Sequence, residues 1–287
     1  MENKPTSLPP QHQNQQPGLE QKMHPKPEYI RPGYKGSDKL RNKVALITGG
    51  DSGIGRSVAV HFAREGADVA IVYKPEEQAD AEQTRELVEK EGRKCLLLAG
   101  DLREADFCIE IVEQTAKELG GLNVLVNNAA EQFISTDLTQ VPEEQWKDTF
   151  EVNFFSFVRV TKAALEYLKA GDSIINTSSI NAYRGNQQLV DYTSTKGAIT
   201  AFTRSMAQQL ADKKIRVNAV APGPIWTPLI PASFPPEKVG EFGQDTTMKR
   251  PGQPSEVGPC YVFLACEDAS YITGQALHPN GGEILNT

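Results

Sequence analysis

A tyrosine and a lysine stand four positions apart in this chain, at Tyr192 and Lys196. Positions i and i+4 of a helix share one face, so the phenol and the ammonium can point at the same substrate. A cation about 4 Å away, at an effective dielectric constant of about 20, favours the phenolate by roughly 4 kcal/mol and should lower the tyrosine pKa from about 10 toward neutrality. We therefore expect Tyr192 to act as a general acid and base that exchanges a proton with a carbonyl or alcohol oxygen.

Two more polar residues are candidates for this site. Ser179 lies thirteen positions before Tyr192, at the end of a predicted strand, where its hydroxyl can hydrogen-bond the reacting oxygen. Asn153 lies in a phenylalanine-rich helical segment, although asparagine is a poor residue for a helix interior. An exposed helical asparagine is the alternative for Asn153. We predict Asn153, Ser179, Tyr192 and Lys196 to be catalytic, with Ser179 and Tyr192 in contact with the substrate.

A glycine-rich turn lies between a predicted strand at residues 44–47 and a predicted helix, with the spacing Gly-x-x-x-Gly-x-Gly. Glycines permit a tight turn and let a pyrophosphate approach the main-chain amides at a helix N-terminus, whose partial positive charge favours an anion. A turn without a ligand is the alternative, but the position between strand and helix favours nucleotide binding. The predicted contacts are Gly49, Asp51, Ser52, Gly53, Ile54 and Gly55.

The elements that must position these residues alternate along the chain. Short apolar runs indicate strands buried on both faces at 44–47, 69–72, 95–98, 124–126, 173–176 and 217–220. Helical segments are expected near 54–65, 76–92, 103–119, 143–169 and 190–213. This alternation predicts one doubly wound α/β domain, with a mostly parallel sheet flanked by helices on both faces.

The first forty residues differ from the rest, because prolines and glutamines replace nearly all aliphatic residues. Residues 1–40 are therefore expected to form an N-terminal arm and residues 41–287 the catalytic domain, with a proline-rich substrate loop at about 222–254. The arm has two alternatives. It is either a solvated tail or an extended segment that lies across the body or a neighbouring subunit, anchored by Tyr29, Ile30 and Tyr34.

The composition argues against several classes of protein. The chain has 287 residues, and a hydrophobic content of 39% is ample for one large domain. A net charge of −7 without a basic block argues against nucleic acid and membranes as partners, and the lack of a long apolar run or a secretory signal favours the cytoplasm. We expect no metal and no disulfide, because Cys95, Cys108, Cys260 and Cys266 lack the spacing of a metal or redox site.

These landmarks, together with Asn127-Asn-Ala-Ala130 and Pro222-Gly223, resemble the short-chain dehydrogenase/reductase family, in the family's order and over about residues 40–287. The proline-rich arm is similar to that of the glucose/ribitol dehydrogenase-like branch. The resemblance implies a Rossmann-type domain, an NAD(P) cofactor and a homotetramer with dihedral symmetry. Ala130 departs from the family's Asn-Asn-Ala-Gly, and its methyl group would narrow the nicotinamide end of the site.

The resemblance also implies roles for individual residues. Lys196 would hold the nicotinamide ribose, and Asn153 would open its helix locally and hold a water that relays protons to the lysine. Asp101 and Leu102 would touch the adenine, unless Asp101 only caps a helix. The other cofactor contacts would be Asn128 and Ala129 at the ribose and Pro222, Gly223, Ile225 and Thr227 near the nicotinamide, where Thr227 could instead be a turn residue.

The end of the second strand decides between NAD and NADP, because an acidic residue there binds the ribose 2′-hydroxyl and an arginine accepts a 2′-phosphate. Tyr73 occupies this place and Lys74 follows it, which favours NADP weakly. Asp51 in the glycine turn should repel a phosphate, and Arg56 is the one arginine nearby. We therefore expect NAD as the preferred cofactor, in contact with Tyr73 and Lys74.

The leading hypothesis is an oxidoreductase that transfers a hydride between the nicotinamide and a carbonyl or secondary alcohol. The substrate is expected to be a small sugar, polyol or polar aldehyde, because polar candidates lie near the site. The candidates are Glu131, Gln132, Asn181, Gln187 and Gln188, beside Trp226, Leu229 and Phe234. The alternative from another class is a catalytically silent nucleotide-sensing or scaffold protein, and an isomerase or epimerase would need a tightly held cofactor.

Overall fold

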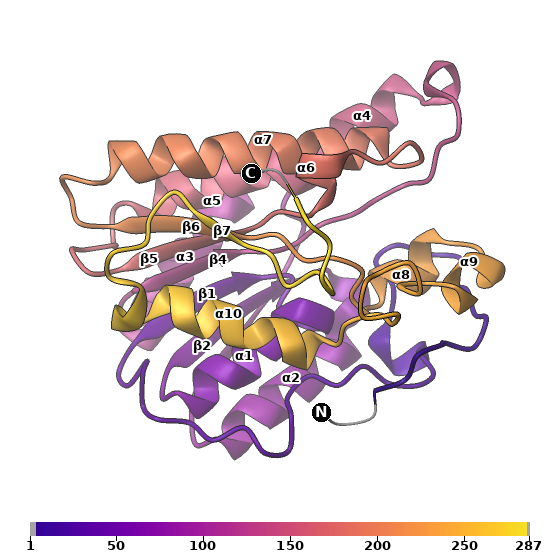
Figure 1. Ribbon diagram of the computed structural model, residues 1–287. Helices are drawn as coiled ribbons and strands as arrows, with labels where there is room; N and C mark the ends of the chain where they lie inside the picture. The colour runs from indigo at the N-terminus through magenta and orange to yellow at the C-terminus, as the bar shows by residue number, and fades with distance from the viewer. Residues whose placement is uncertain (1–3, 286–287) are drawn as a thin grey trace.

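The computed structural model describes residues 4–285, and its centre is a sheet of seven parallel strands (Figure 1). The strands are β1 (Val44–Thr48), β2 (Asp68–Tyr73), β3 (Cys95–Ala99), β4 (Val124–Asn127), β5 (Ser173–Thr177), β6 (Arg216–Val220) and β7 (Ala276–Leu277). Their spatial order is β3-β2-β1-β4-β5-β6-β7. This order confirms the doubly wound α/β fold that was predicted from the alternation of strands and helices.

The direction of winding changes between β1 and β4. Ala45 of β1 lies opposite Val69 of β2 on one side and opposite Val124 of β4 on the other. The connections that leave the carboxyl ends of β1 and β4 therefore diverge to opposite faces of the sheet and leave a crevice between them. The glycine turn follows β1 and the second asparagine of Asn127-Asn-Ala-Ala130 follows β4, so both motifs lie at this crevice.

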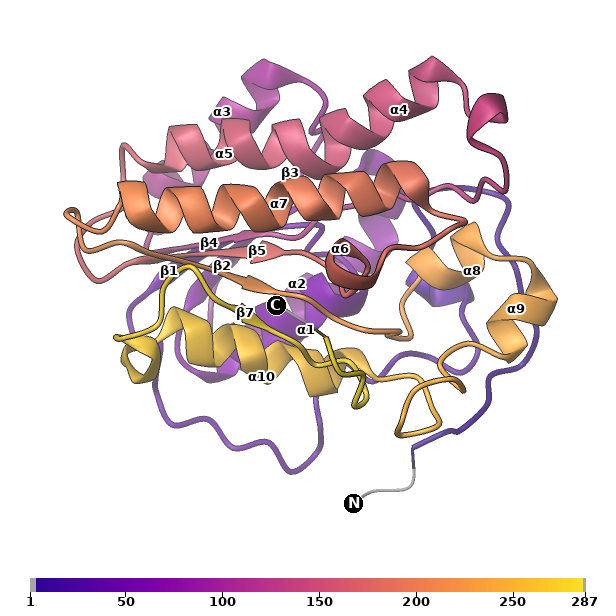
Figure 2. The ribbon, with the colours of Figure 1, turned by 45° about the horizontal axis from the view of Figure 1, so that its top comes forward.

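Helices cover both faces of the sheet (Figures 1 and 2). One face carries α1 (Gly53–Arg64), α2 (Gln78–Lys90) and α10 (Pro254–Ala265), and the other carries α3 (Ala105–Leu119), α5 (Ser156–Ala164) and α7 (Val190–Gln209). Neighbouring strand residues alternate between two cores, since Ile47 packs with α1 and α10 whereas Leu46 packs with α3 and α5. β1 and β2 are apolar at nearly all consecutive positions because each face of the sheet has its own core.

Shorter elements complete the chain. They are α4 (Glu143–Phe150), the π turn η4 (Glu151–Phe155), α6 (Asn181–Arg184), α8 (Leu229–Ser233), α9 (Pro236–Gly240) and the 3-10 turns η1 (Glu20–Lys22), η2 (Pro75–Glu77), η3 (Leu138–Gln140) and η5 (Glu267–Ala269). Both α8 and α9 lie in the segment that was predicted as a substrate loop. This segment is therefore an ordered element and not a featureless loop.

Three features differ from the prediction. The strand β3 is at the edge of the sheet, so Cys95, Leu96 and Leu97 are only partly buried rather than covered on both faces. The helix expected at 143–169 is interrupted by the π turn at Glu151–Phe155. The pattern also gave no sign of the two-residue β7 or of α10, because Pro259 within α10 is unfavourable in a helix interior.

The N-terminal arm lies across the body of its own chain, beside α8 and α9 (Figure 2). Leu8 and Met23 of the arm are buried against Trp226, Ile230 of α8 and Val239 of α9, in a small apolar cluster separate from the two main cores. Burial of these side chains offsets the entropy that ordering the arm costs. Of the two alternatives, the structure shows the extended segment, lying on its own chain, and not a solvated tail.

The three residues expected to anchor the arm differ in their contacts. The Tyr34 hydroxyl donates to Glu65 Oε1 at 2.5 Å, and its ring lies edge-on to His61 at 4.6 Å between centroids. Tyr29, Ile30 and Tyr34 are all only half-buried. Tyr34 is therefore an anchor, whereas most of the burial comes from other arm residues.

Residues 4–285 contain no helix that is long and apolar enough to cross a membrane, and no group of three or more His, Cys, Asp or Glu side chains arranged for a metal. All four cysteines are free thiols. Burial raises the pKa of Cys95 to about 12 and that of Cys108 to about 11, so both remain protonated at neutral pH.

Candidate active site

A cavity of about 280 Å³ opens at the carboxyl ends of the strands, at the crevice between β1 and β4. Its walls come from the glycine turn, the loops after β2, β4, β5 and β6, and the first half of α7. The predicted cofactor and catalytic residues that line it are Gly49, Asp51, Ser52, Gly53, Ile54, Lys74, Asn128, Ala129, Ser179, Tyr192, Lys196, Pro222, Gly223, Ile225 and Thr227. The fold thus brings residues from both halves of the chain to one place.

The glycine turn has the shape that a dinucleotide requires. Gly49 and Gly53 have positive φ angles of 62° and 50°, which favour glycine. A Cβ atom on Gly55 would lie only 1.8 Å from the main-chain oxygen of Gly49. Because α1 begins at Gly53, the positive end of a 12-residue helix lies at the cavity and can attract a pyrophosphate, although the Gly53 amide itself donates to Glu20 of the arm.

Asn128 joins the glycine turn to the centre of the sheet. Its Nδ2 donates to the main-chain oxygens of Thr48 and Gly49, each at 3.1 Å, and its Oδ1 accepts from Thr177 Oγ1 at 3.2 Å. Thr48 Oγ1 in turn accepts from the amides of Asn128 at 2.8 Å and Ala129 at 3.1 Å. These bonds fix the ends of β1, β4 and β5 relative to one another. The side chain of Asn128 therefore has a structural role at the edge of the cavity.

Tyr192 and Lys196 lie on α7 and are both buried. Lys196 Nζ donates to the main-chain oxygen of Thr177 at 2.9 Å and lies 5.3 Å from the centroid of the Tyr192 ring. Burial raises the pKa of Tyr192 to about 12, with partial opposition from the Ser179 hydroxyl, and burial lowers the pKa of Lys196 to about 7. The expected tyrosine pKa near neutrality is wrong for this structure, because desolvation of the buried phenol raises its pKa.

These shifts determine where the protons are at neutral pH. Tyr192 keeps its proton and can donate it to a carbonyl oxygen. Lys196 has a pKa near neutrality, so it gains or loses its proton readily next to the phenol. Tyr192 is therefore the proton donor of the pair, and Lys196 is a second group beside it that titrates near neutral pH.

Ser179 follows β5 and faces the cavity near Tyr192. Its Oγ accepts a hydrogen bond from the Asn181 amide at 3.2 Å, which orients the hydroxyl. The next residue back, Ser178, donates from Oγ to the main-chain oxygen of Lys196 at 3.1 Å and so ties the end of β5 to α7. The hydroxyl of Ser179 and the phenol of Tyr192 can therefore share one substrate oxygen.

Asn153 is fully buried in the π turn, so the alternative of an exposed helical asparagine is wrong. Its Oδ1 accepts from the amide of Glu131 and its Nδ2 donates to the carbonyl of the same residue, each at 2.8 Å. A longer contact of 3.3 Å joins Nδ2 to Thr195 Oγ1, beside Lys196. Asn153 therefore fixes the loop after β4 against the catalytic helix, and π turns of this kind are frequent at functional sites.

Arg56 is not available to a cofactor phosphate. Its side chain is 1% exposed and is held by Glu20, Thr84, Gln83 and the main-chain oxygens of two acidic residues. Nearby, burial and then the charge of Asp51 raise the pKa of Glu77, and burial also raises that of Asp51. These two carboxyl groups therefore share less than two full negative charges at the cavity wall.

Several predicted residues do not line the cavity. Asp101 receives hydrogen bonds from the amide and guanidinium of Arg103, which hold its pKa below the usual value although burial opposes them. It does not cap a helix either, because α3 begins only at Ala105, after Glu104. The Tyr73 hydroxyl donates to Gln78 at 2.7 Å. The others outside the lining are Gly55 and Leu102 among the predicted cofactor contacts, Asn153 among the catalytic residues, and Gln187, Gln188 and Trp226 among the substrate candidates.

The cavity also has walls that the sequence did not reveal. Gln16, Pro17 and Gly18 of the arm line it, as do Arg184 and Phe242. Glu131, Gln132, Asn181, Leu229 and Phe234 lie in the lining as expected for substrate contacts. No local pattern marks the arm residues as part of a site, since their partners are more than a hundred positions away.

Comparisons with known proteins agree with this geometry. A family model described as Enoyl-(Acyl carrier protein) reductase matches residues 49–283. General stress protein 39 of Bacillus subtilis (strain 168) is 61% identical over 287 residues, which is 100% of both chains. Glucose and ribitol dehydrogenase of Daucus carota is 51% identical, over 97% of this chain and 98% of its own length.

Two more proteins carry a cofactor in their names. NADPH-dependent aldehyde reductase 1, chloroplastic, of Arabidopsis thaliana is 51% identical, over 96% of this chain and 98% of its own. A crystal structure of a short chain dehydrogenase from Burkholderia cenocepacia J2315 in complex with NADP superposes with a TM-score of 0.80 at 28% identity, over 85% of this chain and 98% of its own. The chain therefore belongs to the short-chain dehydrogenase/reductase family of NAD(P)-dependent oxidoreductases, among the relatives of glucose and ribitol dehydrogenase, as its motifs predicted.

Proposed function

We propose that the protein reduces a small polar aldehyde, or the open-chain form of a sugar, with NADPH, and oxidises the matching alcohol in reverse. The observation that carries this proposal is the meeting of Ser179, Tyr192 and Lys196 with the glycine turn in one cavity. A protonated, buried phenol next to a serine hydroxyl is suited to a substrate that needs one proton on its oxygen. When bound, the nicotinamide supplies the hydride.

Each residue then has one task. Ser179 and Tyr192 bind the carbonyl oxygen, and Tyr192 donates the proton as negative charge develops on that oxygen. Lys196 is held by the Thr177 carbonyl, and in its protonated form it stabilises the phenolate that Tyr192 becomes after it has donated its proton. Asn153 keeps the wall opposite α7 in place through both main-chain groups of Glu131.

NADPH is proposed rather than the NAD expected from the sequence. The expectation of NAD rested on repulsion by Asp51, but Asp51 is buried beside Glu77 and the pair shares a reduced charge. Lys74 is the basic side chain at the end of β2 that lines the cavity, and an ammonium there can bind a 2′-phosphate. The NADPH-dependent relative and the NADP-bound structure support the same choice.

The substrate class follows from the walls beyond the catalytic pair. Gln132, Asn181, Arg184 and Asn186 supply polar groups, and apolar side chains of the substrate loop face them. A cavity with convergent polar groups suits a compound with several hydroxyls. The names of the carrot and Arabidopsis relatives, a glucose and ribitol dehydrogenase and an aldehyde reductase, point to the same class.

The test is a substrate panel with purified enzyme, monitored by loss of NADPH absorbance. Short aldehydes that carry hydroxyls should be reduced, and identification of the alcohol product by chromatography should account for the NADPH consumed. Tight binding of NADPH without turnover of any aldehyde or sugar would instead support the nucleotide-sensing alternative and end the enzymatic proposal for this class.

A homotetramer is proposed as the assembly. The face formed by η4, α5 and α7 carries a ring cluster in which Phe154 contacts Phe155 and Phe202, and Phe155 is 42% exposed. A second copy of the chain would cover this cluster. Light scattering after size exclusion measures the mass of the assembly directly.

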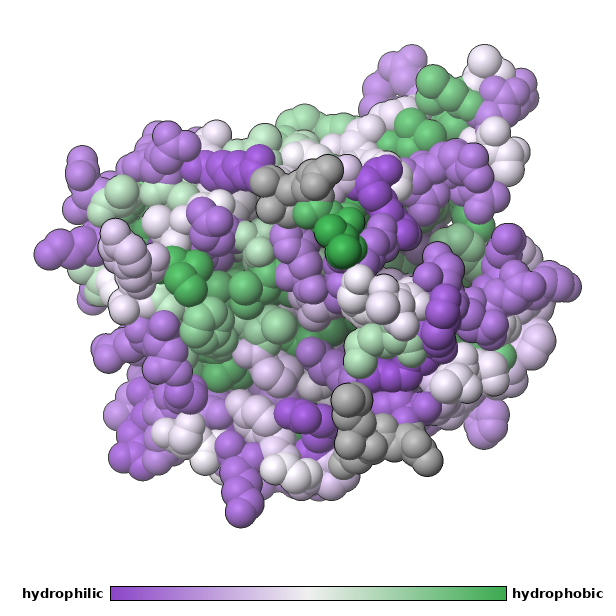
Figure 3. All heavy atoms as spheres, in the orientation of Figure 1, coloured by the Kyte–Doolittle hydropathy of each residue, from purple (hydrophilic) through white to green (hydrophobic). Residues whose placement is uncertain are grey.

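On another face, apolar atoms gather between α10 and β7 (Figure 3), where Phe263, Ile272 and Leu277 are partly buried.

A further inference from the structure

The arm holds a wall of the cavity through the side chain of Gln16. Its Nε2 donates to the main-chain oxygen of Gln132 at 2.5 Å, and its Oε1 accepts from the amide of Gln132 at 3.2 Å. Glu131, the preceding residue, is held in the same manner by Asn153. The loop after β4 is therefore clamped at two consecutive residues, one by the catalytic core and one by the arm.

The arm also fixes the substrate loop. The amide of Gln13 donates to the main-chain oxygen of Pro231 at 2.8 Å, and Trp226 Nε1 donates to the main-chain oxygen of Pro25 at 2.9 Å. A Cβ atom on Gly18 would lie 2.4 Å from the main-chain oxygen of Pro228, so the arm approaches α8 as closely as a glycine allows. A loop of this length is often mobile in a binding site, but here it is held in one position.

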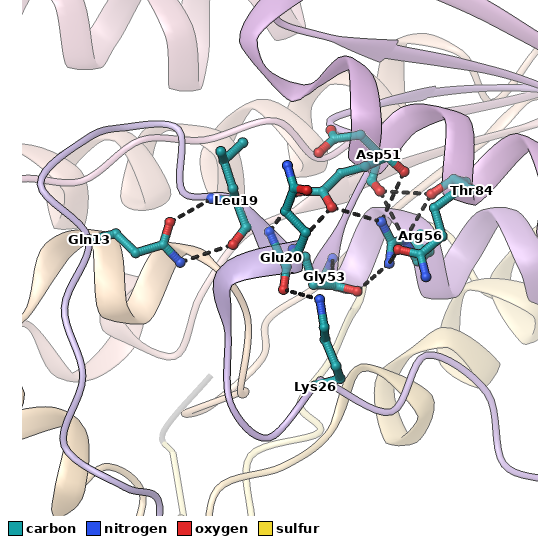
Figure 4. Close-up of polar contacts among 11 residues, drawn as sticks. Gln13, Leu19, Glu20, Lys26, Asp51, Gly53, Arg56 and Thr84 are labelled. Atoms are coloured by element: carbon teal, nitrogen blue, oxygen red, sulfur yellow. Dashed lines mark hydrogen bonds and ion pairs between the residues drawn. The ribbon is translucent and has the colours of Figure 1, made fainter.

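A buried anchor determines where the arm begins this path (Figure 4). Glu20 forms an ion pair with Arg56, and its Oε2 accepts from the amide of Gly53 at 2.7 Å, at the start of α1. The amide of Glu20 donates to Asp80 Oδ2 at 2.7 Å. Each of these charged side chains is at most 3% exposed, so the anchor is shielded from solvent and salt.

The segment between these contacts is itself rigid. The side-chain amide of Gln13 donates to the main-chain oxygen of Leu19 at 3.0 Å and accepts from the Leu19 amide at 2.8 Å, which closes residues 13–19 into a loop (Figure 4). Gln16, Pro17 and Gly18 stand at the centre of this loop and line the cavity. The part of the arm that lines the cavity is thus held in a closed loop by its own hydrogen bonds.

We propose that residues 13–20 are a fixed wall of the substrate pocket, and that Gln16 and Gly18 limit the size of the carbonyl compound that enters it. This inference rests on the proposed reductase function. The family model begins at residue 49, so this wall is an addition to the machinery that the model describes. A loop held in its working position needs no ordering when substrate binds, which favours small substrates that fit the preformed pocket.

Gly18→Ala tests the wall, because its added methyl group must push the arm away from α8. Gly33→Ala is the matched control, since nothing lies within 4 Å of a Cβ at that position in the same arm. Gln16→Ala removes both bonds to Gln132 without adding an atom. Its control is Gln209→Ala, which changes an exposed glutamine at the end of α7, outside the arm and the cavity lining. The two changes loosen the wall in different ways, so failure of one variant to fold leaves the other to decide.

The measurement is kcat and KM for a series of aldehydes of increasing chain length and branching, with the NADPH Kd from fluorescence titration. In Gly18→Ala and Gln16→Ala, KM for the smallest substrate should rise about tenfold, as expected for the loss of about 1.4 kcal/mol of fit. The ratio of kcat/KM for bulky to small aldehydes should rise by about the same factor, while the NADPH Kd and both controls stay at parental values.

An unchanged ratio across the series in folded variants, even with a lower melting temperature, would show that the arm only stabilises the fold and would overturn the proposal. Failure of the parent enzyme to turn over any member of the series is a different result. It would reject the reductase function itself, and the proposed wall with it.

Discussion

The Lys196 ammonium donates to the main-chain oxygen of Thr177 at 2.9 Å, and this bond is formed inside a fully buried site. Burial lowers the pKa of Lys196 from 10.5 to about 7. The cost of burying the charge falls on the native state, since in the unfolded chain the same amine titrates near its ordinary value. The burial that brings the pKa of Lys196 close to neutrality therefore also lowers the stability of the native state.

Lys196→Met should make the protein more stable at pH 7. Between pH 7 and about 10 the unfolded state binds more protons than the native state, so the parent gains stability as pH rises while the variant does not. We expect an advantage of about 2 kcal/mol for the variant at pH 7, after a loss for the unpaired Thr177 carbonyl. At pH 10 the advantage should turn into a deficit of about 1 kcal/mol, because that loss remains while the cost of burying the charge has nearly gone. Urea unfolding at both pH values measures it, with the exposed Lys213→Met as control. A difference that does not change with pH would contradict the lowered pKa of the buried lysine.

Asn153→Ala should lower kcat/KM by about tenfold to a hundredfold, because it leaves both main-chain groups of Glu131 unpaired beside the catalytic helix. Its effect should not add to that of Gln16→Ala, since Gln132 and Glu131 are neighbours. A double-mutant cycle on kcat/KM checks this. Strict additivity would mean that the two clamps act on separate parts of the site.

Lys74→Ala should raise KM for NADPH by about tenfold and leave KM for NADH within about twofold, because only NADPH carries the 2′-phosphate. Lys94→Ala, which changes an exposed lysine outside the cavity, is the control. Equal changes for both cofactors would refute the proposed phosphate contact, and a parent that prefers NADH would restore the preference expected from the sequence.

Arg56→Met should destabilise the fold by about 3–5 kcal/mol, because it leaves the buried carboxylates of Glu20 and Asp80 without their cation. The loss should appear in urea unfolding at neutral pH and shrink in acid, where Glu20, whose pKa is raised by burial, binds a proton. Arg204→Met on the exposed side of α7 should change stability by less than about 0.5 kcal/mol. Similar losses in the two variants would argue against the buried anchor.

The sheet could be predicted because the main strands are short runs of mostly apolar residues, and the catalytic residues because their spacing is local or tied to a strand end. The missed α10 contains Pro259, and β7 has two residues, so neither leaves a periodic pattern. The arm's place on the body depends on Glu20 meeting Arg56, which lies 36 positions away, and no pattern within the arm encodes such a pair.

The pKa of Tyr192 was expected to be lowered but is raised, and the reason for this error differs from the reason why α10 and the arm were missed. From the sequence, Lys196 was expected to lower the pKa of Tyr192 through its charge. Burial acts on both groups at once, and its size depends on how completely the rest of the chain excludes water. That quantity belongs to the tertiary structure, so the spacing of two residues predicts their proximity but not their protonation.

The most direct test of the proposed chemistry is Tyr192→Phe, which removes one hydroxyl from the cavity. Reduction of a short hydroxyaldehyde by NADPH should fall by about a thousandfold or more in kcat, because the proton donor is gone, while the NADPH Kd stays within about twofold of the parent. A variant that retains more than about a tenth of the parental kcat would contradict the assignment of Tyr192 as the proton donor.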